Sequence, residues 1–483
     1  MQNHKIKGGV NPSPHRGPVR LSDNQEEWSG GDRRGASILV IGAGMSAAQL
    51  IKYLEGHSAE FNWSLTVADK HVSVIKKKVS PGTKVVKFDL FDVNKREKLV
   101  SEADVVVSLL PARFHIEVAR TCLKFGRSLF TASYESDEMR ELSDEIEKKG
   151  LLFLNETGLD PGIDHMSAMH IIDRIKAEGH KLLDFESFTG GLIAPESDDN
   201  PWHYKFTWNP RNVVVAGQGG PAKFIQEGKY KYIPYNRLFR RTELIEIEGY
   251  GRFEGYANRD SLKYIKQYHL EGVPTVYRGT LRRPGFCRAW NVFVQLGMTD
   301  DTYYMENTED MTYREFVNSF LYYHPSDSVR TKLFHYMHID QDSDIIEKLE
   351  YLDLFTDKKL GLEKATPAQA LQHILTKKWK LQPDDRDMIV MWHKFIYREK
   401  GKRSKKELTS SLVVEGRSQT DTAMSRTVGL PLAIAVKLYL TGRLNVTGLH
   451  IPNFKDIYEP VLEELKDYGI AFNENVRDKH NGD

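Results

Sequence analysis

The stretch that decides the fold is Ser37-Ile-Leu-Val-Ile-Gly-Ala-Gly-Met-Ser-Ala47. It predicts a short apolar strand, a turn with the pattern G-x-G-x-x-A, and the start of a helix. In such a turn Gly42 permits the tight bend, Gly44 lets a pyrophosphate approach the backbone, and Ala47 allows the helix to pack closely on the strand. The helix N terminus adds unpaired N–H groups and a positive dipole, so the stretch predicts a dinucleotide-binding turn.

The second predicted strand, Leu65–Ala68, is followed by the carboxylate of Asp69. Asp69 lies 25 residues beyond Gly44, close to the spacing of an acid that binds the ribose 2′-OH. A 2′-phosphate would meet this carboxylate as a like charge, so Asp69 favours NAD over NADP. Lys70 and the basic run 76–78 act in the opposite direction, so NADP stays open as an alternative.

Strands and helices alternate as far as residue 160. Short apolar strands are predicted at 85–88, 105–109 and 129–131, with helix-length segments between most of them. This alternation indicates an α/β fold with a Rossmann-type doubly wound parallel sheet. Open sheets of this kind bind ligands at the carboxyl ends of their strands, so Asp89 and the segment 108–111 are expected near the nucleotide. Asp89 has the alternative role of a helix N-cap.

The composition and the predicted secondary structure change after residue 160. Long loops rich in Gly, Pro, Asn and aromatics mix with strands after residue 160, and a mainly helical segment follows. The predicted segments are 1–36, a disordered extension; 37–160, the dinucleotide-binding domain, completed by a helix near 424–442; 161–300, the first part of a substrate domain; 301–383, a helical insertion; and 384–483, return strands of the substrate domain with C-terminal helices.

The composition is that of a folded, water-soluble protein, with 40% apolar and 28% charged residues over 483 positions. A net charge of +1 indicates no nucleic-acid partner, and no apolar run is long enough to indicate a membrane span. The only cysteines, Cys122 and Cys287, form no CxxC pair, which excludes a disulfide framework and suggests a reducing compartment. The first 36 residues lack the apolar region of a signal peptide, so we expect a cytoplasmic protein.

Several polar motifs follow the glycine turn in a set order. They are Thr131-Ala-Ser-Tyr134, Gly158-Leu-Asp-Pro-Gly-Ile-Asp-His165, Gly190-Gly-Leu-Ile-Ala-Pro-Glu196, Asn200-Pro-Trp-His-Tyr-Lys-Phe-Thr-Trp208, Tyr256-Ala-Asn-Arg-Asp-Ser261, Arg278-Gly-Thr-Leu-Arg282, Asp387-Met-Ile-Val-Met391 and Thr427-Val-Gly-Leu-Pro431. From about Ser37 to the C terminus, this series resembles saccharopine dehydrogenase of the glutamate-forming type. Long motifs in matching order are far more specific than a glycine pair.

The resemblance implies an enzyme that oxidises saccharopine with a nicotinamide nucleotide and water, giving glutamate and 2-aminoadipate 6-semialdehyde. It implies a Rossmann domain, a mixed-sheet α+β substrate domain and a helical insertion, with the last long helix packed on the Rossmann domain. The positions that match the family's cofactor contacts are Gly42, Ala43, Gly44, Met45, Ser46, Asp69, Lys70, Asp89, Leu90, Leu110, Ser133 and Tyr134. Those that match its saccharopine contacts are Ser133, Tyr134, Asp160, Arg259, Thr280, Leu281 and Arg282.

The chemistry of these side chains agrees with such a substrate. Saccharopine carries three carboxylates, and Arg259 and Arg282 supply guanidinium groups that grip carboxylates. Asp160 and Tyr134 are the candidates for catalytic proton transfer at the amine, and a carboxylate also stabilises the cationic iminium that hydride loss leaves. Plainer interpretations exist, namely a structural ion pair for each arginine and helix capping for Asp160.

Two positions depart from the family's usual residues. Relatives commonly have Tyr where this chain has Ala112, and they often have Cys where it has Thr189, so substrate choice is open.

The rival functions are a carboxynorspermidine-type dehydrogenase and a non-catalytic nucleotide-sensing protein. No metal is expected, because His170 lies five residues after His165, off the face that an i, i+4 ligand pair shares. A homodimer is compatible with the sequence, which does not set the oligomeric state.

Overall fold

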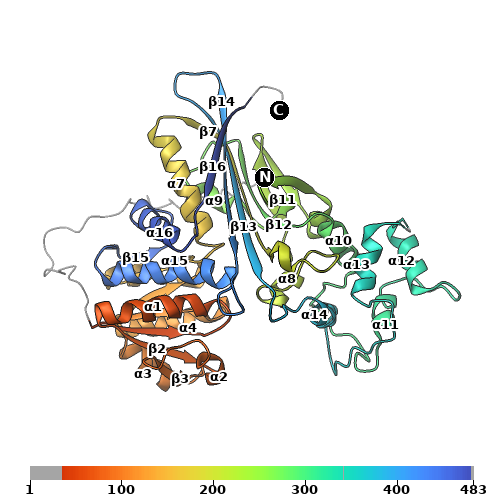
Figure 1. Cartoon of the computed structure of the whole chain (residues 1–483), viewed down its shortest axis with the longest axis horizontal. Coiled ribbons are helices and arrows are strands. Elements are labelled where there is room, and N and C mark those ends of the chain that lie inside the picture. Colours follow the sequence, from red (N-terminus) through yellow and green to blue (C-terminus); the bar gives the residue numbers. More distant parts are fainter. Residues whose placement is uncertain (1–34, 341, 480–483) are drawn as a thin grey trace, which may run out of the picture.

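The computed structural model describes residues 35–340 and 342–479, so nearly all of the extension expected to be disordered lies outside the described residues. Two sheets organise the chain (Figure 1). The first has seven parallel strands in the order β15-β6-β5-β4-β1-β2-β3. Its strands are β1 (Ser37–Ile41), β2 (Ser64–Asp69), β3 (Lys84–Lys87), β4 (Val105–Ser108), β5 (Ser128–Thr131), β6 (Leu152–Leu154) and β15 (Gly448–His450).

Helices cover both faces of this parallel sheet. Along β1, Ile38 and Val40 belong to one hydrophobic core, while Leu39 and Ile41 belong to another. This alternation follows from the two-residue period of a strand, and it confirms the predicted doubly wound sheet. The covering helices are α1 (Ala47–Phe61), α3 (Val93–Ser101), α4 (His115–Phe125) and α6 (Ser143–Lys148), with shorter α2 (Val72–Ile75), α5 (Asp137–Arg140) and the 3-10 helix η1 (Ala112–Phe114).

The C-terminal part of the chain completes the parallel sheet. Helix α15 (Ala423–Leu440) packs along α1, and a Cβ on Gly429 would lie 2.8 Å from the backbone nitrogen of Leu50. Helix α15 is long and apolar enough to cross a membrane, but 83% of its span is buried inside the fold, as in a core helix. The sequence prediction grouped 448–450 with the substrate domain, whereas β15 pairs with β6 and extends the Rossmann sheet.

The second sheet is mixed and has nine strands. Its main order is β10-β11-β12-β7-β13-β14-β16, and the hairpin β8–β9 attaches to β12. Strands β7 and β12 pair in parallel, and the other neighbours are antiparallel. The strands are β7 (Lys181–Ile193), β8 (Ala222–Gln226), β9 (Lys229–Ile233), β10 (Thr242–Ile247), β11 (Gly251–Ala257), β12 (Thr275–Arg282), β13 (Asp387–Arg398), β14 (Lys405–Glu415) and β16 (Asn473–Lys479).

Different helices cover the two faces of the mixed sheet. On one face lie α7 (Ile163–Ala177) and α16 (Lys455–Asp467), whose buried side chains join the core shared with the Rossmann sheet. On the other face, a core rich in aromatic residues includes Trp202, Trp290 and Trp379. The helices there are α8 (Pro210–Val214), α10 (Phe286–Leu296), α11 (Tyr313–Asn318), α12 (Val329–Met337), α13 (Asp344–Tyr351) and α14 (Pro367–Lys378). Helices α11 to α13 lie at the end of the molecule away from the Rossmann sheet (Figure 1).

Candidate active site

The glycine turn after β1 lies open at the N terminus of α1. Gly42 has φ +99°, and a Cβ there would lie 2.9 Å from the carbonyl oxygen of Leu109, so only glycine fits. A Cβ on Gly44 would meet no atom within 4 Å, which leaves the space that a pyrophosphate needs. The Ala47 N–H donates to the Gly44 carbonyl (3.2 Å), but the Ser46 side chain makes no capping hydrogen bond, so it leaves the next N–H groups of α1 available to an anion.

Asp69 ties this turn to the end of β2. Its Oδ2 accepts a hydrogen bond from the Ala43 N–H (2.8 Å), and its Oδ1 accepts one from the His71 N–H (2.8 Å). Lys78, which the sequence identified only as part of a basic run, donates from Nζ to the Ala43 carbonyl (2.7 Å) and to the Gly44 carbonyl. A carboxylate and an ammonium therefore both lie beside the turn.

Asp89 lies at the end of β3 but does not cap a helix. Its Oδ1 accepts from the Phe91 N–H, and its Oδ2 lies 3.6 Å from the Lys70 Nζ. The N-cap of α3 is Asp92, whose side chain accepts from the Lys95 N–H. The capping alternative for Asp89 is therefore wrong, and its position at a strand end leaves the predicted adenine contact open.

A buried histidine connects the ends of β4 and β5. Ser108 Oγ lies 2.8 Å from His115 Nδ1, and His115 Nε2 lies 2.7 Å from Ser133 Oγ. Burial lowers the pKa of His115 to about 4, so the ring is neutral near pH 7 and orients the Ser133 hydroxyl. The sequence prediction included Ser133 but missed His115, because no spacing rule connects a strand-end serine with a histidine in the next helix.

Asp160 lies in the loop that docks against the end of β5. A Cβ on Gly158 would come within 2.9 Å of the Ala132 Cβ, so glycine lets this loop reach the strand end. The Tyr134 hydroxyl donates to Asp160 Oδ1 (3.1 Å), and Arg278 Nη2 donates to the same oxygen (3.1 Å). The structure thus brings the two predicted catalytic side chains into contact.

The electrostatics make Asp160 the ionised member of this group. Burial raises its pKa, but the Arg278 guanidinium and the Tyr134 hydroxyl outweigh burial, so the pKa of Asp160 lies below its usual value. Burial and the Asp160 charge hold the pKa of Tyr134 well above its usual range. Near neutral pH, Asp160 is therefore a proton acceptor beside a protonated phenol.

Asp164 and Gly162, rather than Asp160, form the N terminus of α7. Gly162 is the N-cap, and its N–H donates to Asp164 Oδ1 (2.5 Å). Asp164 also accepts a hydrogen bond from Arg278, although burial raises the pKa of its carboxyl. The capping interpretation of Asp160 is therefore wrong, and Arg278 is a central residue that the sequence prediction quoted only as part of a motif.

His165 makes hydrogen bonds through both ring nitrogens. Its Nε2 lies 2.8 Å from Glu156 Oε2, and its Nδ1 lies 2.5 Å from the Tyr268 hydroxyl. Among residues 35–340 and 342–479, no group of three or more His, Cys, Asp or Glu side chains is arranged to hold a metal ion. His165 therefore stabilises the buried part of the loop that carries Asp160.

Strand β12 carries a row of polar side chains from Arg278 toward its C-terminal end. Arg278, Thr280 and Arg282 alternate along the strand and so share one face. Thr189 lies opposite Thr280 on the parallel neighbour β7. Leu281 points to the other side and is fully buried, so only its backbone is left to meet a substrate. The row continues the polar surface that begins at Asp160.

Arg282 is buried without a carboxylate partner. Its guanidinium carbon lies 5.1 Å from the Tyr204 ring centroid and 5.3 Å from that of Phe286, and Nη1 donates to the Leu281 carbonyl. Within the described residues, no partner exists for Arg282 Nε, nor for the buried oxygens Tyr204 Oη, Thr207 Oγ1 and Thr189 Oγ1. Buried polar atoms are rarely left unpaired, so this group has the chemistry to receive an anionic ligand. The ion-pair interpretation of Arg282 is therefore wrong.

Arg259 lies at the turn after β11. It is exposed and adopts φ +44°, a conformation that side chains rarely adopt. No carboxylate lies within ion-pair distance of its guanidinium in the part of the chain that the structure describes, so the ion-pair alternative is not seen for Arg259 either. Strained backbone of this kind is typical of binding sites, and the predicted role in substrate binding stays open.

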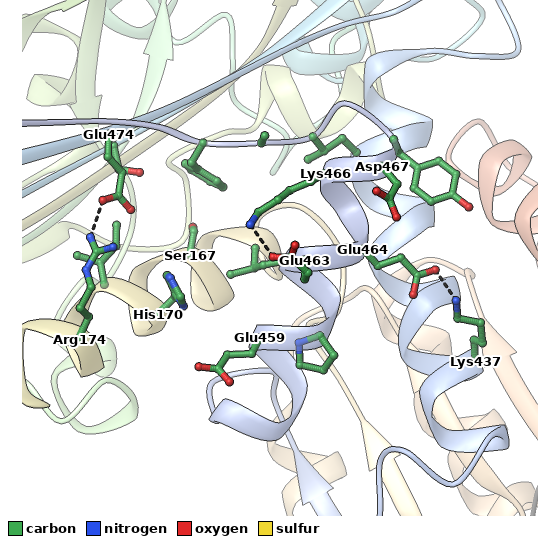
Figure 2. A pocket seen from close by; sticks show the side chains of 18 of the residues that line it. Ser167, His170, Arg174, Lys437, Glu459, Glu463, Glu464, Lys466, Asp467 and Glu474 are labelled. Carbon is green, nitrogen blue, oxygen red and sulfur yellow. Dashed lines mark hydrogen bonds and ion pairs between the residues drawn. The ribbon is translucent and has the colours of Figure 1, made fainter.

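A separate cavity lies elsewhere and contains none of the predicted site residues. It has a volume of about 1130 Å³ and is lined by α7, α15, α16 and the segment before β16 (Figure 2). Most of its charges neutralise one another, as in the pairs Lys437–Glu464 (2.6 Å) and Arg174–Glu474 (2.5 Å). We therefore assign the chemistry to the Asp160 region instead.

Comparison with known proteins agrees with this geometry. A family model described as saccharopine dehydrogenase NADP binding domain matches residues 38–154, and one described as saccharopine dehydrogenase C-terminal domain matches residues 158–470. Saccharopine dehydrogenase [NADP(+), L-glutamate-forming] of Saccharomyces cerevisiae is 33% identical over 92% of this chain and 99% of that protein. The apo structure of saccharopine dehydrogenase (L-Glu forming) from the same yeast superposes with a TM-score of 0.83. The two sequences are 32% identical, and the match covers 92% of this chain and all of that chain.

A second group of relatives is longer than this chain. The mitochondrial alpha-aminoadipic semialdehyde synthase of Rattus norvegicus is 33% identical over 451 residues, which cover 90% of this chain and 47% of that protein. The chain therefore spans about half the length of these synthases and nearly the whole length of the fungal dehydrogenases.

Proposed function

This chain belongs to the saccharopine dehydrogenase family, and we propose that it oxidises saccharopine with a nicotinamide nucleotide and water to L-glutamate and 2-aminoadipate 6-semialdehyde, or catalyses the reverse reaction. The observation that carries this proposal is the ionised Asp160 between Tyr134 and Arg278, beside strand ends that also bear the dinucleotide-binding turn. The Arg282 guanidinium, which has no carboxylate partner among the described residues and a buried Nε without a hydrogen bond, supports a substrate with carboxylates over a polyamine.

The residues of the site divide the chemistry among them. The bound nicotinamide ring supplies hydride acceptance when the nucleotide is present. Asp160 takes the proton of the secondary ammonium and becomes neutral, and the free amine can then lose hydride from the adjacent carbon to leave an iminium that water attacks. Tyr134 and Arg278 orient the Asp160 carboxylate through hydrogen bonds to the same oxygen.

The test is a spectrophotometric assay with saccharopine and either NAD or NADP, with glutamate identified as a product. We expect turnover by the wild-type chain, and a loss of about 100-fold or more in kcat/KM for Asp160→Asn, with nucleotide affinity unchanged. Asn keeps the size of the side chain and an acceptor for Tyr134 but does not take a proton. No absorbance change with either nucleotide would favour the non-catalytic function, and full activity of Asp160→Asn would remove Asp160 from the mechanism.

The nucleotide preference is proposed from the end of β2. Asp69 supports NAD, because each of its oxygens keeps acceptor capacity for a ribose hydroxyl, whereas a 2′-phosphate would meet its charge. The names of the fungal relatives and of the matching family model point to NADP, and Lys70 and Lys78 supply cations nearby. We expect NAD to be preferred, and Asp69→Ala to shift the ratio of kcat/KM values at least tenfold toward NADP. A wild-type preference for NADP would refute the assignment.

A further inference from the structure

Lys263 is a cation at the site that the proposed mechanism does not use. It begins the short helix α9 (Lys263–Gln267), and its side chain is exposed. Its Nζ lies 4.5 Å from the ring centroid of Tyr134 and 4.8 Å from that of Tyr264. No hydrogen bond or ion pair holds this ammonium within the described parts of the chain. An accessible positive charge therefore lies on the ring whose hydroxyl contacts Asp160.

The contact with the two aromatic rings does not neutralise the positive charge of Lys263. A cation over buried or half-buried rings is stabilised by about 0.5–2 kcal/mol, and the rings carry no compensating negative charge. Of the nearby carboxylates, Glu156 interacts most strongly with Lys263, but it is already hydrogen-bonded to His165 and to the Glu135 N–H. Asp160 and Asp164 are engaged by Arg278. The Lys263 ammonium is thus left to meet an anion that the chain itself does not provide.

Each carboxylate of the proposed substrate can be assigned to a cation of the site that has no carboxylate partner in the described part of the chain. Saccharopine has three carboxylates. Among the residues that match the family's saccharopine contacts, two guanidinium groups, those of Arg259 and Arg282, lack a carboxylate partner within the described part of the chain. Arg282 lies four residues along β12 from Arg278, or roughly 13 Å at the rise of a strand, so it suits a carboxylate far from the reacting amine. Lys263 is the third cation, and it lies beside the acid that faces the amine.

We propose that Lys263 binds the carboxylate attached to the carbon next to the reacting nitrogen, that is, the α-carboxylate of the glutamate part. This inference rests on the proposed function. An amine held against Asp160 has this carboxylate only two bonds away, so the two groups reach Asp160 and Lys263 together. The role is that of a substrate-binding residue that selects amines bearing an α-carboxylate.

The first experiment compares Lys263→Met, Lys263→Arg and the matched control Lys148→Met, which removes an exposed lysine of α6. With saccharopine, we expect Lys263→Met to raise KM at least tenfold, with kcat changed less and nucleotide affinity unchanged. Lys263→Arg keeps the charge and should fall between Lys263→Met and wild type, while Lys148→Met should match wild type. A KM for Lys263→Met within twofold of wild type would overturn the proposal, as would equal losses in kcat and nucleotide binding.

The second experiment identifies the carboxylate. In the reductive direction the amine donors are glutamate, γ-aminobutyrate, which lacks the α-carboxylate, and 2-aminobutyrate, which lacks the γ-carboxylate. We expect Lys263→Met to lose at least tenfold of the preference for glutamate over γ-aminobutyrate and to keep the preference over 2-aminobutyrate. Unchanged preferences would contradict the assignment. A wild-type chain that turns over no saccharopine would refute the proposed function instead, and calorimetric titration of glutamate into wild type and Lys263→Met would then decide the role of Lys263 separately.

Discussion

Replacing Arg278 by Met tests whether one guanidinium holds two buried carboxylates in place. Arg278 is 5% exposed and bonds both Asp160 and Asp164, whose side chains are 15% and 0% exposed. Removing one partner of a buried ion pair costs about 3–5 kcal/mol, because the remaining charge stays unpaired in a poorly solvated place. An exposed ion pair contributes about 1 kcal/mol or less, so the effect should be clearly larger than that of any surface charge.

The pH dependence of this loss follows from the carboxyl pKa values. In the wild-type chain, the pKa of Asp160 lies below its usual value through Arg278, so its ionisation stabilises the fold above the unfolded pKa, and that contribution is lost as pH falls through the folded pKa. Without Arg278, burial raises the pKa of Asp160 and of Asp164 above the unfolded value. Stability of the variant is then highest when both are protonated and falls as pH rises. The loss of unfolding free energy in Arg278→Met relative to wild type should therefore be smaller at pH 5 than at pH 8.

The measurement is urea unfolding followed by tryptophan fluorescence at both pH values. The matched control is Arg330→Met, which removes an exposed arginine that lies 3.1 Å from Glu350. We expect Arg278→Met to lose at least about 2 kcal/mol more than Arg330→Met at pH 8. If the two variants unfold alike at pH 8, the pair of carboxylates does not depend on Arg278, and the electrostatic account of Asp160 fails.

Three further predictions concern the same site and its support. Arg282→Lys keeps the charge but loses the planar two-pronged contact, so KM for saccharopine should rise with nucleotide affinity unchanged, and untouched saccharopine kinetics would refute this role. Gly429→Ala places a Cβ 2.8 Å from the Leu50 nitrogen; it should cost about 1–3 kcal/mol in urea unfolding and weaken nucleotide binding in a fluorescence titration. For His115→Asn, the free energy of unfolding should depend less on pH between pH 6.5 and 4. Burial lowers the pKa of His115 to about 4, so between these pH values the unfolded wild type takes up a proton that the folded chain does not, and this costs the wild type about 3 kcal/mol of stability at low pH. Parallel pH profiles of His115→Asn and wild type would contradict this.

The nucleotide turn could be predicted from the sequence because local geometry dictates it. A strand, two glycines and a helix start within eleven residues, and the contact that excludes a side chain at Gly42 comes from the neighbouring parallel strand. The fold class followed from the alternation of short apolar strands with helices up to residue 160. Strand β15 did not, because three residues are too few to show a two-residue pattern, and the neighbour of this strand is almost 300 positions away.

The arrangement around Asp160 was only partly accessible to sequence reasoning. Tyr134 and Asp160 were paired through the family resemblance, but the motif Arg278-Gly-Thr-Leu-Arg282 contains two arginines on one face of a strand. The sequence does not tell which of them meets the acids of a loop 118 residues earlier. Asp89 and Asp92 posed the same difficulty, since either acid can cap a helix until its first turn is known.

The return of the chain to its first sheet has a consequence for biosynthesis. Helix α1 is complete early, but the helix that covers it begins at Ala423, 376 positions after Ala47. At about 5–20 residues per second, a ribosome needs on the order of tens of seconds to supply that cover. During this interval the apolar side of α1 has only the unfinished chain or a chaperone to shield it. The nucleotide-binding part is therefore translated before the substrate domain and is among the last parts to become fully packed, and a chain that ended at residue 160 would lack its closing helix.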